Sequence, residues 1–351
     1  MNSIERRSFM ARDRFADALK GYACLLVIFG HVLIGIRTSG TAVPAFCLPA
    51  EKFIWSFHID LFMFLSGFVY SLTGGSKRSG SAKDFLLSKL AALGIPYIIF
   101  SSLYTAVNCL TPGVNNQSSF SDLLTLWYKP VAQYWFIFAL FWLFVLWTLL
   151  SKFLPNFAVT LILYAVFLFG KCFNISFGFL DSSLNCVLAF GIGTCLTSIR
   201  VDKIPPLLRA ATAALHIAAT FLAIKTGFLG RFLADDLFTV FGIFSSLCFI
   251  SLVWKIPAVS KFLLYICKYS FPLYLLHTFF TAAARIFLLK LGIANFAVQL
   301  CVGTAAGILL PLVCAKIAER SPYLEILFYP KKGYSEIKSR KKAAHLAGRE
   351  R

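Results

Sequence analysis

Ten apolar segments constrain this chain more than any other feature of its sequence. About 20 mostly apolar residues cross a bilayer core about 30 Å thick, and in lipid such a segment has to satisfy its own backbone hydrogen bonds as a helix. The fifth and sixth segments are divided least clearly, because residues 172–182 are also apolar. We predict an all-α integral membrane protein with about ten transmembrane helices in one bundle. The predicted spans are 18–36, 53–73, 86–109, 132–150, 153–171, 183–199, 207–225, 233–253, 268–289 and 293–316.

The composition excludes a soluble enzyme and a nucleic-acid-binding protein. Of the 351 residues, 59% are apolar and 14% are charged, whereas a soluble domain has about 45–50% and about 25%. The net charge of +19 would suit nucleic acid, but the chain has too few polar residues for the polar surface of such a protein. Surplus Lys and Arg are instead typical of the cytoplasmic loops of membrane proteins.

The distribution of positive charge predicts the orientation. If the N-terminus is cytoplasmic, 26 of the 34 Lys and Arg residues fall on the cytoplasmic side, as the positive-inside rule requires. Both termini are therefore expected in the cytoplasm, and the protein in the cell (inner, cytoplasmic) membrane. We divide the chain into a basic cytoplasmic N-terminus (1–17), a transmembrane domain (18–320) and a basic cytoplasmic tail (321–351). The part of the tail after Tyr329 is expected to be flexible and attracted to anionic headgroups.

The N-terminus and the cysteines exclude several other interpretations. No small-residue cleavage site follows the first apolar segment, so we expect a retained span rather than a signal peptide. The ten cysteines show neither a CxxC motif nor a Cys/His metal spacing, and most lie in apolar runs, where Cys packs as a small hydrophobic residue. We expect no metal, and we find no nucleotide-binding loop.

Ionisable residues inside spans are costly and usually functional. Lys20 and His31 are 11 residues apart in the first span. At about 100° per residue they share one helix face, separated by about 16 Å along the axis. Asp17 lies on that face too, where it can pair with Lys20. Since a cation facing lipid would be expensive, we predict that this face lines a cavity.

Further polar residues lie near the depth of either Lys20 or His31 in the predicted bundle. His58 and Asp60 begin the second span at about the depth of His31, and we expect a histidine as the partner of Asp60, a pairing that suits a general base. Lys89 lies level with Lys20, His277 lies near the midplane, and Trp135 lies near the outer end of the fourth span. Simpler interpretations stay open: lysines that snorkel to headgroups, histidines that only pack, and an interfacial tryptophan anchor.

The sequence resembles the acyltransferase-3 family of integral membrane acyltransferases, in particular its fucose 4-O-acetylase-like branch. The resemblance covers about residues 14–320. It rests on RFADALKGYACLLVIFGH, FHIDLFMFLSGFVYS, LAALGIPYIIF, QYWFIFAL and YSFPLYLLH. Members carry Arg or Lys, ten residues, then His, and Lys20 and His31 fit that spacing. The resemblance implies a catalytic His31 and a Lys20 that contacts the acyl donor.

Two positions depart from the family pattern. Members usually have two basic residues three apart before the proline of the third helix, and here Lys89 matches the first while Ala92 replaces the second. Asp60 stands where members often have proline. No SGNH hydrolase-like domain is expected after the transmembrane domain.

The expected function follows from this resemblance. We expect an O-acyltransferase that moves acetyl from cytosolic acetyl-CoA, a co-substrate rather than a bound cofactor, to a hydroxyl of a cell-surface glycan or its lipid-linked precursor. His31, Asp60 and His58 are the candidate catalytic residues, Lys20 and Lys89 the candidate donor-binding residues. His31 acts either as a general base or as a transient acyl carrier. The alternative is a proton-coupled transporter or flippase of a glycan precursor that uses the same buried His and Asp as a relay.

The remaining candidate residues and partners are expected without a specific chemical role. Trp135, His277 and Asp17 are expected to bind the acceptor or to support the site. The expected partners are the acyl-CoA donor, the sugar acceptor and membrane lipids, with no nucleic acid. The oligomeric state stays open, a homo-oligomer included.

Overall fold

The computed structural model describes residues 13–75, 81–111 and 117–347, and every regular element in those ranges is helical. Nine of the described helices are long and apolar enough to cross a membrane, and a bent pair, Gly178–Asn185 with Val187–Cys195, makes up to ten. The predicted all-α fold with about ten spans is confirmed. The orientation of the termini stays a prediction, and most of the predicted N-terminal region 1–17 lies outside the described residues.

The span-forming helices follow the predicted order, and three spans are irregular. The second span consists of two helices, α3 and α4. The third contains a π-helical turn, η2, between α5 and α6. The sixth is the bent pair, in which the first segment ends with α9 and the second segment is α10. The helices are α2 (Arg14–Thr38), α3 (Cys47–Trp55), α4 (His58–Leu72), α5 (Ala82–Lys89), η2 (Leu90–Gly94), α6 (Ile95–Leu110), α7 (Trp135–Leu150), α8 (Asn156–Phe173), α9 (Asp181–Asn185), α10 (Val187–Cys195), α11 (Pro206–Lys225), α12 (Phe232–Val253), α14 (Ser270–Lys290) and α15 (Phe296–Ala318).

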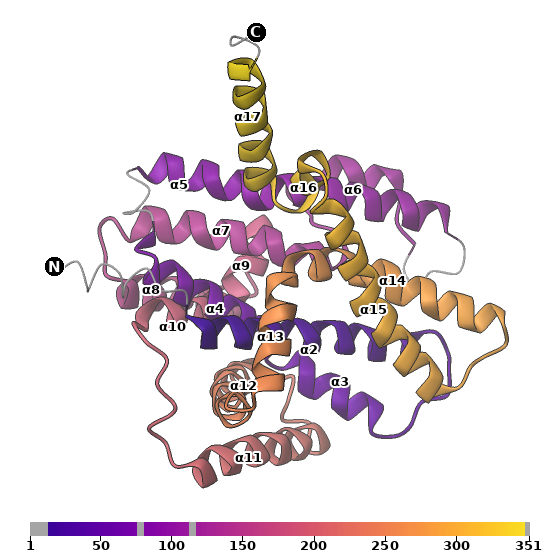
Figure 1. Ribbon diagram of the computed structural model, residues 1–351. Coiled ribbons are helices and arrows are strands. Elements are labelled where there is room, and N and C mark those ends of the chain that lie inside the picture. Colours follow the sequence, from indigo (N-terminus) through magenta and orange to yellow (C-terminus); the bar gives the residue numbers. More distant parts are fainter. Residues whose placement is uncertain (1–12, 76–80, 112–116, 348–351) are drawn as a thin grey trace.

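The first helix, α2, lies in the middle of the bundle (Figure 1). Asp13 caps it by accepting hydrogen bonds from the backbone N–H groups of Phe15 and Ala16 at 2.9 and 3.0 Å. It packs against α4, α13, α14 and α15. Its central position fixes the residues on its faces, including Lys20 and His31, relative to most of the fold.

Two glycines bring α4 and α10 into backbone contact. A Cβ atom on Gly67 would collide with the carbonyl oxygen of Phe190, and one on Gly193 would collide with the carbonyl oxygen of Phe64. Small residues allow such close approach between helices in membranes, where van der Waals packing replaces the hydrophobic effect. This contact holds the second span, which carries one wall of the site described below.

Gly67→Ala is therefore expected to destabilise the protein by about 1–3 kcal/mol, the usual cost of overpacking. The measurement is thermal unfolding of the purified protein in detergent. Val69→Ala is the control, because Val69 is exposed on the same helix and its truncation is expected to leave the unfolding temperature nearly unchanged. Equal unfolding temperatures for Gly67→Ala and the wild type would contradict the contact.

Two segments that the sequence did not predict as helices are helical. The predicted loop after the eighth span contains α13 (Pro257–Lys268), whose Leu263 carbonyl lies against Gly21 of α2. The predicted tail contains α16 (Pro322–Phe328) and α17 (Pro330–Ala347), and α17 points away from the bundle (Figure 1). The segment after Tyr329, which we expected to be flexible, is thus helical as far as Ala347.

Good helix formers and ion pairs explain the helical tail. Pro330 begins α17 at the first helical position, where proline is favoured, and Glu336 accepts from Arg340 one turn later at 2.6 Å. Lys332 forms an ion pair with the buried Glu325 of α16, and this hydrogen bond raises the pKa of Lys332. The start of α17 is thereby attached to the bundle.

Candidate active site

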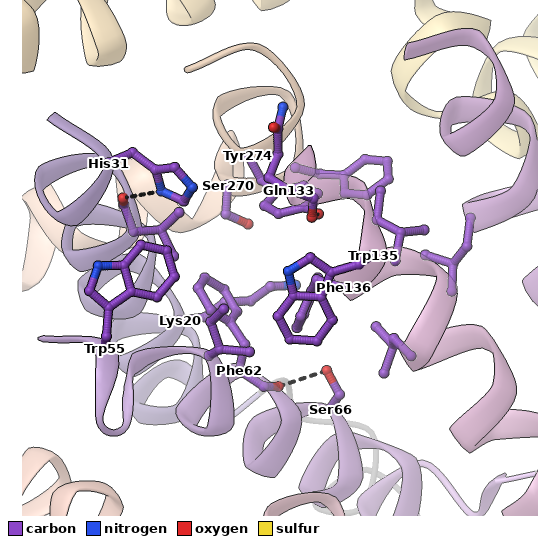
Figure 2. Close-up of a pocket in the computed structure, with 16 residues that line it drawn as sticks. Lys20, His31, Trp55, Phe62, Ser66, Gln133, Trp135, Phe136, Ser270 and Tyr274 are labelled. Carbon is purple, nitrogen blue, oxygen red and sulfur yellow. Dashed lines mark hydrogen bonds between the residues drawn. The ribbon is translucent and has the colours of Figure 1, made fainter. Parts of the chain in front are cut away.

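A cavity of about 130 Å³ lies beside the middle of α2. Figure 2 shows His31 and Trp55 on one side of it, Trp135 on the other, and Lys20 and Phe62 between them. Gln133, Ser270 and Tyr274 also line it. The structure thus brings Lys20 and His31 of the first span and Trp135 of the fourth span to one cavity.

A second, larger cavity of about 470 Å³ adjoins the first. Asp17, Lys89 and Ala92 line it, and Lys20 lines both. The other residues shared by the two cavities are Phe62, Ser66, Leu93 and Leu140. The two cavities therefore share a wall that contains Lys20, and His31 lines the narrower one, as the shared helix face of the two residues predicts.

The hydrogen bond of His31 leaves one ring nitrogen free for chemistry. Its Nδ1 lies 2.9 Å from the carbonyl oxygen of Val27, one turn earlier in α2. Because a carbonyl oxygen only accepts, Nδ1 carries the proton, and Nε2 of the neutral ring keeps its lone pair. A nitrogen in this state can accept a proton or attack a carbonyl.

Two more histidines and a tryptophan surround His31. The His31 and His277 ring centroids are 4.8 Å apart, and Trp55 lies between His31 and His58 at 5.2 and 4.7 Å. His58 and His277 also donate through Nδ1 to carbonyl groups of their own chain segments. Their Nε2 atoms and the Trp55 Nε1 are buried without a hydrogen-bond partner among the described residues. The structure thus gathers three imidazoles at one level of the bundle.

Asp60 does not join these histidines. Its carboxylate accepts a hydrogen bond from Thr239 of α12 at 3.4 Å, and among the described residues no ion pair links it to a histidine. Asp60 follows His58 by two residues, which places the two side chains on different sides of α4. The expected partnership of Asp60 with a histidine is therefore wrong, and the side chain faces α12.

Two lysines, Lys20 and Lys89, line the larger cavity, and a third, Lys331, lies near Lys89. Lys89 Nζ lies 4.1 Å from the ring centroid of Phe144, and Lys89 is close enough to Lys20 and Lys331 for their charges to interact. Lys331, in the first turn of α17, donates to Ser88 beside Lys89. The sequence predicted Lys20 and Lys89 at one level, whereas Lys331 was missed because its position depends on how the tail helices dock.

The wall opposite His31 is built from hydrogen-bonded polar side chains. Gln133 donates to Thr278 at 2.7 Å, and the Tyr274 hydroxyl donates to the Gln133 carbonyl. These bonds attach the segment before α7 to α14 and so position Trp135 in the cavity (Figure 2). Asp17 accepts a weak hydrogen bond from Cys267 of α13 at 3.6 Å. Within the described part of the chain, no group of three His, Cys, Asp or Glu residues could hold a metal ion.

Comparison with known proteins identifies the family. A family model described as "Acyltransferase domain", of the acyltransferase-3 type, matches residues 13–316. The chain belongs to the acyltransferase-3 family. It is also 33% identical over 144 residues to the nodulation protein NolL of Mesorhizobium japonicum, a match that covers 40% of this chain and 37% of that protein. No solved structure matches the chain.

The matched family domain contains most of the candidate site residues. The chain carries an acyltransferase-3 domain and several helices long enough to span a membrane, and the sequence-based assignment to the acyltransferase-3 family is confirmed. Lys20 and His31 lie within the matched region, as do Lys89, Asp60 and Trp135. Lys331 lies outside it, so the tail places a further cation near Lys89, which lines the larger cavity of the family domain.

Proposed function

We propose that this acyltransferase-3 protein moves an acetyl group from cytosolic acetyl-CoA to a hydroxyl of a cell-surface glycan, or of its lipid-linked precursor, at the cytoplasmic membrane. The observation that carries the proposal is the pair of adjoining cavities, with cations at one end and the free Nε2 of His31 at the other. The transmembrane domain 18–320 performs the reaction, and the tail 321–351 contributes to the donor site.

The cationic mouth suits the phosphates of coenzyme A. Lysine ammonium groups act as point charges toward phosphate, and Lys20, Lys89 and Lys331 lie close together there. Ala92, which replaces the second basic residue of the family pattern, lines the same cavity. Lys331 of α17 then supplies the positive charge that Ala92 lacks.

His31 acts on the acceptor in the narrower cavity. Its Nε2 accepts the proton of the acceptor hydroxyl while the hydroxyl oxygen attacks the thioester carbonyl carbon. The carbon–sulfur bond breaks, an ester forms, and the coenzyme A thiolate leaves and takes up the proton. General base catalysis of this kind contributes about 10²–10⁴-fold to a rate. His277 of the neighbouring helix α14 packs against the ring of His31, and Trp135 offers an aromatic face to the sugar.

The free Nε2 is equally suited to attack the thioester itself. In that mechanism the acetyl group is first bonded to His31, coenzyme A leaves, and the acceptor hydroxyl then displaces the imidazole. Incubating the purified protein with radiolabelled acetyl-CoA in the absence of acceptor distinguishes the two courses. Label that stays on wild-type protein but not on His31→Ala indicates the acyl-histidine course.

Asp60 and His58 act as positioning residues in this scheme, because neither lines the cavities. Asp60→Asn keeps an oxygen that accepts from Thr239, so we expect turnover to fall by less than about threefold, within the range of a single modest interaction. The measurement is acetyl transfer by purified protein as a function of acetyl-CoA concentration. A loss of 100-fold or more in kcat, the size expected for a general base, would contradict this assignment and make Asp60 a reacting group.

The function is tested by analysing the surface glycans of a deletion strain. We expect O-acetyl esters that disappear with the gene and return with the wild-type copy, but not with His31→Ala. Unchanged O-acetylation in the deletion strain would contradict the proposal. A transporter instead predicts that the deletion removes the whole glycan unit rather than only its ester.

A further inference from the structure

A second unusual charge lies at the end of α2 that is remote from Lys20. Arg285 belongs to α14, inside a segment long and apolar enough to span a membrane. Its side chain is half-buried, and it forms no ion pair within the part of the chain that the structure describes. An unpaired charge inside a span is costly and is usually retained for function.

The guanidinium lies close to His31. A methyl group placed on Gly35 of α2 would meet Nη1 of Arg285 at 2.5 Å, so the charge packs directly against the backbone at Gly35. Gly35 follows His31 by four residues, which puts the two on one helix face about 6 Å apart along the axis. Arg285 is therefore held about one helical turn beyond the free nitrogen of His31.

Arg285 also lies on the face of α14 that builds the cavity wall. Thr278 precedes it by seven residues, or about two turns, and Thr278 is the hydrogen-bond partner of Gln133. Tyr104 of α6 is close enough to interact electrostatically with the arginine. The charge thus lies among α2, α6 and α14, on the side of His31 that is away from Lys20.

A neighbouring arginine shows what a purely structural cation looks like here. Arg37, two residues beyond Gly35, donates two hydrogen bonds to the buried Glu51, at 2.7 and 2.9 Å. Glu51 neutralises the charge of Arg37, and the guanidinium N–H groups that form the fork are already engaged in these hydrogen bonds. Arg285 has the same fork of N–H groups, which matches phosphate and carboxylate oxygens, but no acidic partner among the described residues.

We propose that Arg285, backed by Gly35, binds an anionic group of the acceptor, so that this enzyme acylates a sugar hydroxyl about one sugar ring away from a phosphate. The inference rests on the proposed function, because it concerns the acceptor of that same site. Phosphate is favoured over carboxylate because a lipid-linked sugar carries its phosphate at the membrane surface, and Arg285 lies five residues, or about 7.5 Å, from the end of α14 at Lys290.

The test uses the full chain in phosphatidylcholine nanodiscs with radiolabelled acetyl-CoA and three acceptor probes. These are farnesyl-phosphoryl-glucose, octyl glucoside and octyl glucuronide. For wild-type protein we expect kcat/KM for the phosphate probe to exceed that for the neutral glucoside by at least about tenfold, the effect of one good charged contact. Arg285→Gln is expected to remove most of this preference, and Arg285→Lys to keep part of it.

Lys290→Gln is the matched control, since Lys290 is an exposed cation at the end of the same helix; it is expected to keep the preference. A readout independent of turnover is the rise in unfolding temperature caused by farnesyl phosphate relative to farnesol, which Arg285→Gln should abolish. The same rise with phosphatidylglycerol would make Arg285 a lipid anchor and overturn the inference.

The other outcomes are equally informative. Equal rates with all probes, or an equal loss on all probes in Arg285→Gln, would overturn the inference and leave the proposed function standing. A preference for the glucuronide would replace phosphate by a carboxylate and overturn the choice of lipid-linked sugar. Failure of the proposed function has a different signature, namely no acetyl-CoA binding and no transfer to any probe, and it would remove the acceptor assignment as well.

Discussion

Replacing His31 by alanine is expected to lower the rate of acetyl transfer by about 10²–10⁴-fold, the range for loss of a general base. The affinity for acetyl-CoA is expected to stay within about threefold of the wild type, because we propose that the donor phosphates bind at the lysine end of the cavities. The reason is geometric: His31 lines the narrower cavity and holds Nε2 free by donating through Nδ1 to Val27. The measurement combines single-turnover transfer with acetyl-CoA binding on the same preparation.

His216 provides the control for this experiment. It is also a buried histidine whose Nε2 lacks a partner among the described residues, but it packs against Phe53, Phe57 and Phe241 and lines neither cavity. His216→Phe preserves aromatic packing and is expected to keep near-normal activity. Equal losses in the two variants would mean that His31 acts only through packing.

Lys20→Ala is expected to weaken acetyl-CoA binding by about tenfold, or about 1.4 kcal/mol, with a smaller effect on the rate at saturating donor. Lys20 is exposed and lines both cavities, so its ammonium group can reach a phosphate without a large desolvation cost. Adding Lys331→Ala is expected to weaken binding further, because Lys331 interacts electrostatically with Lys89 at the same mouth. Binding of radiolabelled acetyl-CoA to protein in nanodiscs measures both changes.

Salt separates this electrostatic role from a structural one. Exposed charges are screened by salt, so wild-type affinity should fall as ionic strength rises, and the fall should be shallower in Lys20→Ala. Lys152→Ala removes an exposed cation that lines neither cavity and should retain the wild-type salt dependence. Identical salt dependence in all variants would place the donor elsewhere.

The spans and the first pair of site residues could be predicted because they depend on local sequence. Segment length and apolar composition determine which stretches cross a membrane. The helical period alone puts Lys20 and His31 on one face, and both line the narrower cavity. The bent sixth span, α9 with α10, is the one that the apolar stretch 172–182 made hard to delimit.

Contacts between distant segments could not be predicted in the same way. Lys331 reaches Ser88 only because α16 and α17 dock on the bundle, and no periodicity in the tail encodes that contact. Asp60 shares a depth with the histidines, but its rotation about α4 directs it toward Thr239. Depth follows from counting residues, whereas the partner across an interface follows from how whole helices pack.

The most direct test of the central claim, that acetyl passes from a donor at the lysine mouth to an acceptor beside His31, uses sealed proteoliposomes. Acetyl-CoA labelled in its acetyl group is supplied on the side of Lys20, and farnesyl-phosphoryl-glucose is supplied only on the other side, with the orientation fixed by an affinity tag on the C-terminus. We predict that label appears in the sugar ester while coenzyme A stays on the side where it was added, and that His31→Ala abolishes the signal. Label that appears only when both substrates share a side, or intact acetyl-CoA that crosses the membrane, would contradict the account.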